Sequence, residues 1–192
     1  MVERKNVMTI IDNAIEFAVH AHEGEKRKGK KRSYILHPLE TMVIVSSITE
    51  DEEVIAAAVL HDVVEDAKIP VSFIEKKYGS RVAELVAAES ENKREGQSEE
   101  ETWKIRKEEA LTHLSSASRD AKIICLGDKL SNLRELARDY DKLGDQIWER
   151  FNQKDKNLHK WYYSEIQKIL EQEFGLIKEI EEYLQLMTEI FN

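Results

Sequence analysis

The densest group of ionisable side chains in the chain directly follows an apolar run. The run VIAAAVL leads into HDVVED at residues 61–66. If one helix continues through this motif, Glu65 lies one turn after His61, and Asp66 is related to Asp62 in the same way. Ionisable groups beside an apolar segment are costly to bury without a compensating partner. The layout therefore suits a metal ion with an acid/base pair beside it, or alternatively a charged helix end with a satisfied histidine.

Two distant segments carry residues of the same types. His37 immediately precedes Pro38, where a side chain at a helix start can point into a neighbouring core. Asp128 lies in the otherwise apolar stretch IICLGDKL, and a buried carboxylate needs a partner such as a divalent cation. Gly127 costs about 1 kcal/mol relative to alanine inside a helix. This cost indicates that another part of the chain approaches the backbone closely at Gly127.

These segments together could supply a set of metal ligands. Their imidazoles and carboxylates suit Mn²⁺, Fe²⁺, Co²⁺ or Zn²⁺, with water on the open positions. The candidate ligands are His37, His61, Asp62 and Asp128. The single cysteine, Cys125, has no Cys or His paired with it locally, so we expect it to be a small buried apolar residue.

A basic segment interrupts a chain that is acidic overall. Six cations surround Gly29 in KRKGKKR, residues 26–32, although the net charge of the chain is −9. A basic strip beside a metal site can attract a multiply charged phosphate ester. Arg106 and Lys107 form a second basic pair on a predicted helix. Solvated surface charge is the alternative interpretation of both groups.

The elements that must position these residues are predicted to be helices. Only seven glycines and two prolines occur, which disfavours a sheet with many tight turns. An apolar stripe from Ile11 to His22 predicts a first helix, which Thr9 and Asp12 open as a capping box. Apolar periodicity predicts further helices over 38–47, 54–66, 71–78, 80–88, 103–114, 119–139, 161–173 and 176–191. We expect residues 90–100 to form an exposed loop, and the chain to be an all-α bundle.

Length and composition narrow the class of protein. A length of 192 residues suits one domain spanning residues 1–192. With 41% hydrophobic and 35% charged residues, the chain is too apolar to be disordered and too charged for a membrane protein. The N-terminus lacks the apolar core of a signal peptide, so we expect a cytoplasmic location. A pI near 5.3 argues against nucleic acid as a partner. The oligomeric state stays open, including a homo-oligomer.

The remaining histidines have ordinary structural interpretations. His22 continues the first apolar stripe, so we expect it to be a hydrogen-bonded core residue. We expect His20, His113 and His159 to lie at the surface.

Longer motifs around the candidate ligands resemble a known family. The motifs are AHEGEKRKGKKRSYILHP (21–38), AAAVLHDVVEDA (56–67), YGSRVAELV (78–86) and CLGDKLSNLREL (125–136). Their order resembles the HD superfamily of metal-dependent phosphohydrolases, and in particular the hydrolase domain of RelA/SpoT proteins and the stand-alone small alarmone hydrolases. The resemblance covers about residues 8–173.

The resemblance implies a single-domain HD-type helical bundle that removes pyrophosphate from the 3′ position of ppGpp or pppGpp, with one Mn²⁺. It makes the four candidate ligands the metal site, and makes Glu65 and Asp66 the pair that positions or deprotonates water. It implies that the following residues contact the nucleotide: Arg27, Lys28, Arg106, Lys107, Asn132 and Tyr162. A synthetase would need a further domain, so we expect hydrolysis without alarmone synthesis.

The chain also departs from the family pattern at Glu25, Ser33, Ala67 and Ser131, where Gln, Pro, Thr, and His or Tyr are common. None of these changes removes a predicted ligand. Ser131 and the basic segment could alter base or sugar recognition. Two alternatives therefore stay open, a phosphohydrolase of another nucleotide and a nucleotide-binding sensor without turnover.

Overall fold

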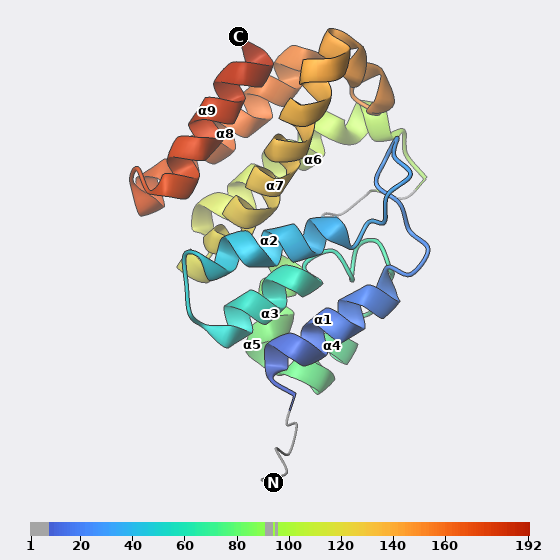
Figure 1. The fold of residues 1–192 in the computed structure, drawn as a ribbon, viewed down its shortest axis with the longest axis vertical. Coiled ribbons are helices and arrows are strands. Elements are labelled where there is room, and N and C mark those ends of the chain that lie inside the picture. Colours follow the sequence, from blue (N-terminus) through green and yellow to red (C-terminus); the bar gives the residue numbers. More distant parts are fainter. Residues whose placement is uncertain (1–7, 91–93, 95) are drawn as a thin grey trace, which may run out of the picture.

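The computed structural model describes residues 8–90, 94 and 96–192, and the regular structure within them is helical (Figure 1). The all-α expectation is confirmed; an isolated bridge between Lys26 and Ser33 is the one β-type pairing among these residues. The elements are α1 (Ile10–Ala21), α2 (Leu36–Ser46), α3 (Glu52–Leu60), α4 (Val71–Tyr78), α5 (Ser80–Ala88), α6 (Glu99–Ser116), α7 (Arg119–Leu143), the 3₁₀ helix η1 (Gly144–Arg150), α8 (Lys156–Phe174) and α9 (Lys178–Phe191).

The helices form two groups with α2 and α7 between them. Figure 1 shows α1, α3, α4 and α5 near the N-terminus, and α6, α8 and α9 at the opposite end. One apolar core lies mainly among the first group and a second mainly among the other, with α2 and α7 contributing to both. The boundary between the two groups is therefore the place where residues from distant parts of the sequence meet.

Gly127 allows α2 and α7 to approach each other closely. A Cβ atom at this position would lie 2.8 Å from Val45 Cγ2 and 3.0 Å from the Thr41 carbonyl oxygen. Both distances are shorter than normal van der Waals contacts, so a side chain here would force the helices apart. The close approach predicted at Gly127 is confirmed.

Capping residues set several helix ends. Thr9 and Asp12 form the predicted capping box at the start of α1. Ser98 accepts a hydrogen bond from the Glu101 amide, so α6 begins at Glu99, inside the stretch that we expected to be a loop. Residues 91–93 and 95 of that stretch lie outside the described residues. Acidic residues at positions 99–101 favour this earlier start because they interact well with the positive end of the helix dipole.

The expected helix through Asp66 is wrong at its C-terminal end. α3 ends at Leu60, and the following HDVVED motif forms turns. The Val63 amide donates to the Leu60 carbonyl at 3.1 Å, a tight turn in place of the α-helical pattern. One helical-type bond remains, from the Asp66 amide to the Asp62 carbonyl at 2.8 Å. His61 therefore follows the helix as its C-cap instead of lying on its face.

His159 was expected at the surface and is buried instead. Its ring packs against Trp103 of α6 and Trp148 of η1, with ring centroids 5.3 and 5.0 Å away. Its Nε2 lies 2.8 Å from the Gln153 carbonyl. The local sequence gave no indication that His159 is buried, because the aromatic rings around it come from separate elements. The expectations for His22 and Cys125 are confirmed, since both are buried and His22 Nδ1 lies 2.8 Å from Glu25 Oε2.

Candidate active site

Three buried side chains meet where the two helix groups join. His37 lies in the first turn of α2, His61 directly follows α3, and Asp128 lies in the middle of α7. One ligand atom from each lies within 4.8 Å of the others. The packing of α2 along α7 brings these residues together, although 91 positions separate the first from the last (128 − 37).

The hydrogen bonds of both histidines leave one ring nitrogen facing the cluster. His61 Nδ1 donates to the Ala58 carbonyl at 2.8 Å, and His37 Nδ1 lies 2.9 Å from Ser131 Oγ. Among the described residues, the buried His61 Nε2 makes no well-aligned hydrogen bond, although Asp62 Oδ2 lies 2.9 Å away. His37 Nε2 lies 3.1 Å from Asp128 Oδ1. Two imidazole nitrogens that face buried carboxylates suit a divalent cation, so these residues fit a metal ion.

Asp62 lies at the edge of the cluster. Its Oδ2 is 2.9 Å from His61 Nε2 and 3.6 Å from His37 Nε2, and it accepts a hydrogen bond of 2.6 Å from the Tyr34 hydroxyl. Burial would lower the pKa of His61, but the charge of Asp62 raises it to about 9. A cation that binds His61 must therefore displace a proton.

Asp128 is held by neighbours on its own helix. Lys129 forms an ion pair with Oδ2, and the Asn132 amide donates to Oδ1 at 2.5 Å. Burial would raise the pKa of Asp128, but the charge of Lys129 and the His37 contact keep it well below its usual value. The carboxylate is therefore ionised at neutral pH, as a metal ligand must be.

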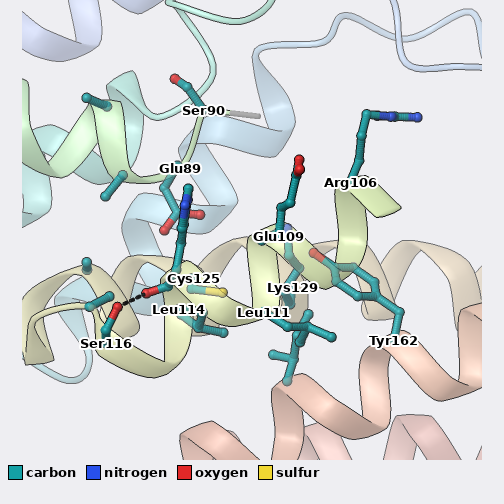
Figure 2. Close-up of a pocket in the computed structure, with 17 residues that line it drawn as sticks. Glu89, Ser90, Arg106, Glu109, Leu111, Leu114, Ser116, Cys125, Lys129 and Tyr162 are labelled. Atoms are coloured by element: carbon teal, nitrogen blue, oxygen red, sulfur yellow. Dashed lines mark hydrogen bonds between the residues drawn. The ribbon is translucent and has the colours of Figure 1, made fainter. Parts of the chain in front are cut away.

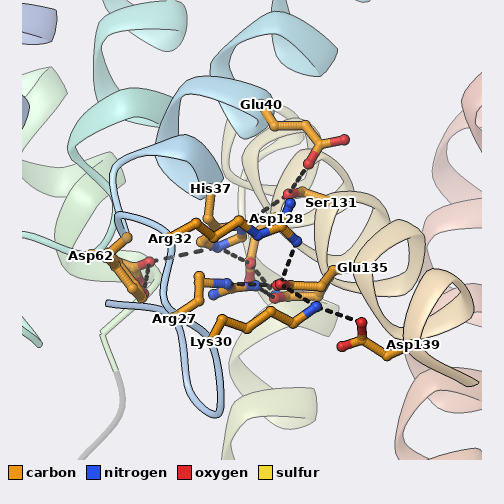
Figure 3. A network of polar contacts seen from close by, with 12 residues as sticks. Arg27, Lys30, Arg32, His37, Glu40, Asp62, Asp128, Ser131, Glu135 and Asp139 are labelled. Atoms are coloured by element: carbon orange, nitrogen blue, oxygen red, sulfur yellow. Dashed lines mark hydrogen bonds and ion pairs between the residues drawn. The ribbon is translucent and has the colours of Figure 1, made fainter. Parts of the chain in front are cut away.

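The basic segment lies against α7, and three of its six cations, Arg27, Lys30 and Arg32, are paired with carboxylates of that helix (Figure 3). Arg27 bonds Glu135 Oε2 at 2.7 Å and Asn132 Oδ1 at 2.6 Å. Lys30 and Arg32 also bond Glu135, at 3.2 and 2.7 Å, and Lys30 lies 2.5 Å from Asp139. The predicted basic strip is beside the metal cluster, and two carboxylates of α7, Glu135 and Asp139, pair with three of its six cations.

The sequence reasoning missed these carboxylates, although α7 carried a signal. Asp128, Asn132, Glu135 and Asp139 occur at i, i+4, i+7 and i+11. This spacing places all four on one face of a helix. Carboxylates and an amide repeated along one face, beginning at the candidate ligand Asp128, indicate a polar surface that another segment with complementary charge can cover.

Glu65 and Asp66 lie on the turn that begins with His61. Both side chains are partly buried. Burial raises the pKa of Tyr34, and the nearby carboxylates of Asp62, which accepts its hydrogen bond, and of Asp66 raise it further. Tyr34, which sequence reasoning also missed, thus links a residue of the metal cluster to one of the predicted acid/base residues.

A cavity of about 410 Å³ lies beside Lys129, the residue after Asp128 (Figure 2). Its wall includes Lys129, whose ammonium contacts Asp128, as well as Arg106 and Tyr162 from α6 and α8. Lys107 lies 4.9 Å from the centre of the Tyr162 ring. Burial raises the pKa of Glu89, another wall residue, to about 7. In the basic segment, Lys28 donates to Asn152 Oδ1 at 3.1 Å.

Comparison with known proteins identifies the family. The sequence pattern of the HD domain family matches residues 14–155. The chain belongs to the HD domain family. Two HD relatives are named guanosine-3′,5′-bis(diphosphate) 3′-pyrophosphohydrolase MESH1. The one from Danio rerio is 33% identical over 132 residues, and the one from Xenopus tropicalis is 37% identical over 133. Each alignment covers 67% of this chain and 70% of the relative.

A solved structure supports the same assignment. It is described as a metazoan ortholog of SpoT that hydrolyzes ppGpp, and it matches with a TM-score of 0.69 and 26% identity over 94% of both chains. The expectation of an HD-type hydrolase fold is confirmed. In this HD domain, the cluster of His37, His61 and Asp128 provides the divalent-metal site. No helix among the described residues is both long and apolar enough to cross a bilayer.

Proposed function

We propose that this HD protein is a metal-dependent 3′-pyrophosphohydrolase of ppGpp and pppGpp that releases pyrophosphate and GDP or GTP. The observation that carries the proposal is the buried His37, His61 and Asp128 cluster, in a chain 33% and 37% identical to relatives named for this reaction. The adjoining cavity of about 410 Å³ is of the size that binds a small ligand.

Four residues are proposed to hold one Mn²⁺. They are His37, His61, Asp62 and Asp128, with Asp62 included because its Oδ2 lies 2.9 Å from His61 Nε2. When bound, the cation supplies Lewis acidity, which acidifies water and offsets negative charge on phosphoryl oxygens. Nitrogen and carboxylate oxygen ligands suit Mn²⁺ among the first-row metals.

Glu65 and Asp66 are proposed to position and deprotonate the attacking water. They follow His61 and Asp62 on the same turn, so their carboxylates can face the reacting phosphate without serving as ligands. Tyr34 lies near Asp66, whose carboxylate helps to raise the pKa of the Tyr34 hydroxyl. A carboxylate that accepts the proton of the attacking water performs general base catalysis.

Substrate contacts are proposed on both sides of the metal cluster. Arg27, Lys28 and Asn132 lie on the side of the basic segment, where Arg27 and Asn132 are hydrogen-bonded to each other. Arg106 and Tyr162 line the cavity, and Lys107 lies over the Tyr162 ring. An aromatic ring can stack on a nucleobase, while the cations can pair with phosphate oxygens. Two flanking basic groups suit a nucleotide that carries phosphates at two positions.

The whole chain, residues 1–192, is proposed to act as one domain in the cytoplasm. The C-terminal helix supports this, because Ile180 and Tyr183 of α9 are fully buried and the Tyr183 hydroxyl donates to the Tyr163 carbonyl at 2.8 Å. A domain that ended near residue 173 would expose these side chains.

Incubation with ppGpp, with and without Mn²⁺, tests the proposed reaction. Anion-exchange separation should show GDP and pyrophosphate only when Mn²⁺ is present. Conversion of dGMP or dAMP but not ppGpp would instead identify a phosphohydrolase of another nucleotide. Tight ppGpp binding without product in the presence of Mn²⁺ would identify a sensor that lacks turnover. Either result overturns the proposal.

A further inference from the structure

Ser131 faces a metal ligand instead of the cavity. Its side chain is 1% exposed, and its Oγ lies 2.9 Å from His37 Nδ1. The same hydroxyl donates a hydrogen bond of 3.0 Å to Glu40 Oε2 (Figure 3). A hydroxyl has one proton, and a carboxylate can only accept. Because the Ser131 proton goes to Glu40, the Ser131 oxygen must accept the proton on His37 Nδ1.

Glu40 is held in turn by residues of α7 and α9. Arg134 Nη1 donates to Glu40 Oε1 at 3.3 Å. Arg134 also forms a two-bond ion pair with Glu182 of α9, at 2.6 and 2.8 Å. Planar pairing of this kind fixes the guanidinium in one orientation. A continuous chain of contacts therefore runs from the C-terminal helix to His37.

Two acceptors compete for the single proton of a neutral His37 ring. Asp128 Oδ1, 3.1 Å from Nε2, would favour a proton on Nε2, whereas the Ser131 oxygen, as a hydrogen-bond acceptor, favours a proton on Nδ1. A metal ion binds only the nitrogen that carries no proton. The outcome of this competition therefore decides whether His37 presents a lone pair or a proton to the metal position.

We infer that Ser131 and Glu40 are positioning residues that hold His37 in its metal-binding tautomer. The carboxylate of Glu40 orients the serine hydroxyl, whose oxygen accepts a hydrogen bond from Nδ1–H. The ring proton therefore stays on Nδ1, and Nε2 faces the metal position with its lone pair. Carboxylate or carbonyl partners of metal-bound histidines commonly have this role, and here a serine is inserted between them. The inference depends on the metal site and not on the identity of the substrate.

Replacing Glu40 with glutamine should reverse the direction of the two hydrogen bonds that Ser131 makes with His37 and residue 40. Arg134 faces Oε1, so the amide oxygen of Gln would turn toward Arg134, and the amide NH₂ would turn toward Ser131. Ser131 would then accept from the amide and donate its proton to His37 Nδ1, which moves the imidazole proton to Nε2. Ser131→Ala removes the hydroxyl altogether and so leaves Nδ1 without an acceptor.

Mn²⁺ titration followed by the electron paramagnetic resonance of the free ion tests the inference without any nucleotide. Losing such a partner typically weakens metal binding about 10- to 100-fold, so we expect Kd to rise by that factor in Glu40→Gln and in Ser131→Ala. Ser47→Ala is the matched control, because Ser47 on the C-terminal side of α2 donates to Glu179 of α9 at 2.9 Å but touches no ligand. Its Kd should equal that of the wild type.

Thermal unfolding of the metal-free proteins separates positioning from folding. Glu179→Gln is the control for this measurement, because it removes the carboxylate that accepts from Ser47 and lies away from the metal cluster. The Tm of Glu40→Gln should stay close to that of Glu179→Gln, while the Mn²⁺ affinity of Glu40→Gln falls. The inference is overturned if Glu40→Gln and Ser131→Ala both bind Mn²⁺ within twofold of the wild type, or if Ser47→Ala loses as much affinity as they do. If Glu40→Gln fails to fold, Ser131→Ala alone decides between these outcomes. Failure of ppGpp hydrolysis would leave these results unaffected.

Discussion

Replacing Glu135 with glutamine should destabilise the fold at neutral pH and should do so less than half as much near pH 3. Burial would raise the pKa of Glu135, but its pairing with Arg27, Arg32 and Lys30 lowers it from 4.5 to about 2. This difference between unfolded and folded chains corresponds to about 3 kcal/mol of folding free energy. The side chain of Arg32 is 43% exposed, and solvent screening reduces the value to about 2 kcal/mol.

The sign of the pH dependence follows from the direction of the pKa change. A carboxyl group whose pKa is lower in the folded chain stabilises it fully above the unfolded value of 4.5. The stabilisation disappears as the pH falls through the folded pKa of about 2. The difference in unfolding free energy between the wild type and Glu135→Gln should therefore be largest above pH 5 and should shrink steadily at lower pH.

Urea unfolding at pH 7, 5, 4 and 3 measures this difference, with EDTA present to remove any contribution from metal binding. Glu149→Gln is the control, because Glu149 and Lys154 form an exposed ion pair, with side chains 71% and 57% exposed. Such pairs contribute about 0–1 kcal/mol. A gap for Glu135→Gln that stayed constant from pH 7 to pH 3, or that matched the Glu149→Gln value at pH 7, would refute the reasoning.

Three other predictions concern the metal cluster and its surroundings. His61→Ala and Asp62→Ala should each abolish bound metal and activity together; wild-type metal content by elemental analysis in both would disprove the ligand assignment. Glu65→Gln should keep its metal but lose turnover about 10²–10⁴-fold, and normal rates in both Glu65→Gln and Asp66→Asn would exclude their roles. Gly127→Ala should lower stability by about 1–2 kcal/mol, because overpacking against α2 costs more than the gain in helix propensity. Chemical denaturation of the metal-free protein checks this value, and a stabilised variant would contradict the packing seen at that position.

The sequence predicted the helical class and the cluster, because both depend on local patterns. Apolar periodicity is a property of neighbouring residues, and HDVVED places two candidate ligands side by side. Gly127 could be interpreted correctly because a glycine inside a helix has a known cost. The end of α3 could not be predicted, because the residues of the motif after Leu60 keep the spacing of a helix. Their backbone nevertheless forms turns.

Long-range pairing could not be predicted from one sequence. The partners of Arg27 and His37 lie more than 90 residues away, at Glu135 and Ser131. Ser131 was expected to affect base or sugar recognition, whereas its hydroxyl contacts a ligand histidine and Glu40. His159 is buried for a similar reason, because its aromatic neighbours come from separate elements. Spacing along the chain carries no information about such contacts.

The pairing of the basic segment with α7 also determines how ionic strength should act on ligand binding. Cations exposed to water attract a diffuse layer of dissolved anions, and their release drives a polyanion to bind in dilute salt. Arg27, Lys30 and Arg32 have Glu135 and Asp139 as covalently attached counterions, which cannot diffuse away. A phosphate group must exchange with these carboxylates instead of displacing dissolved ions. Binding at this segment should therefore depend less steeply on salt than its number of positive charges suggests.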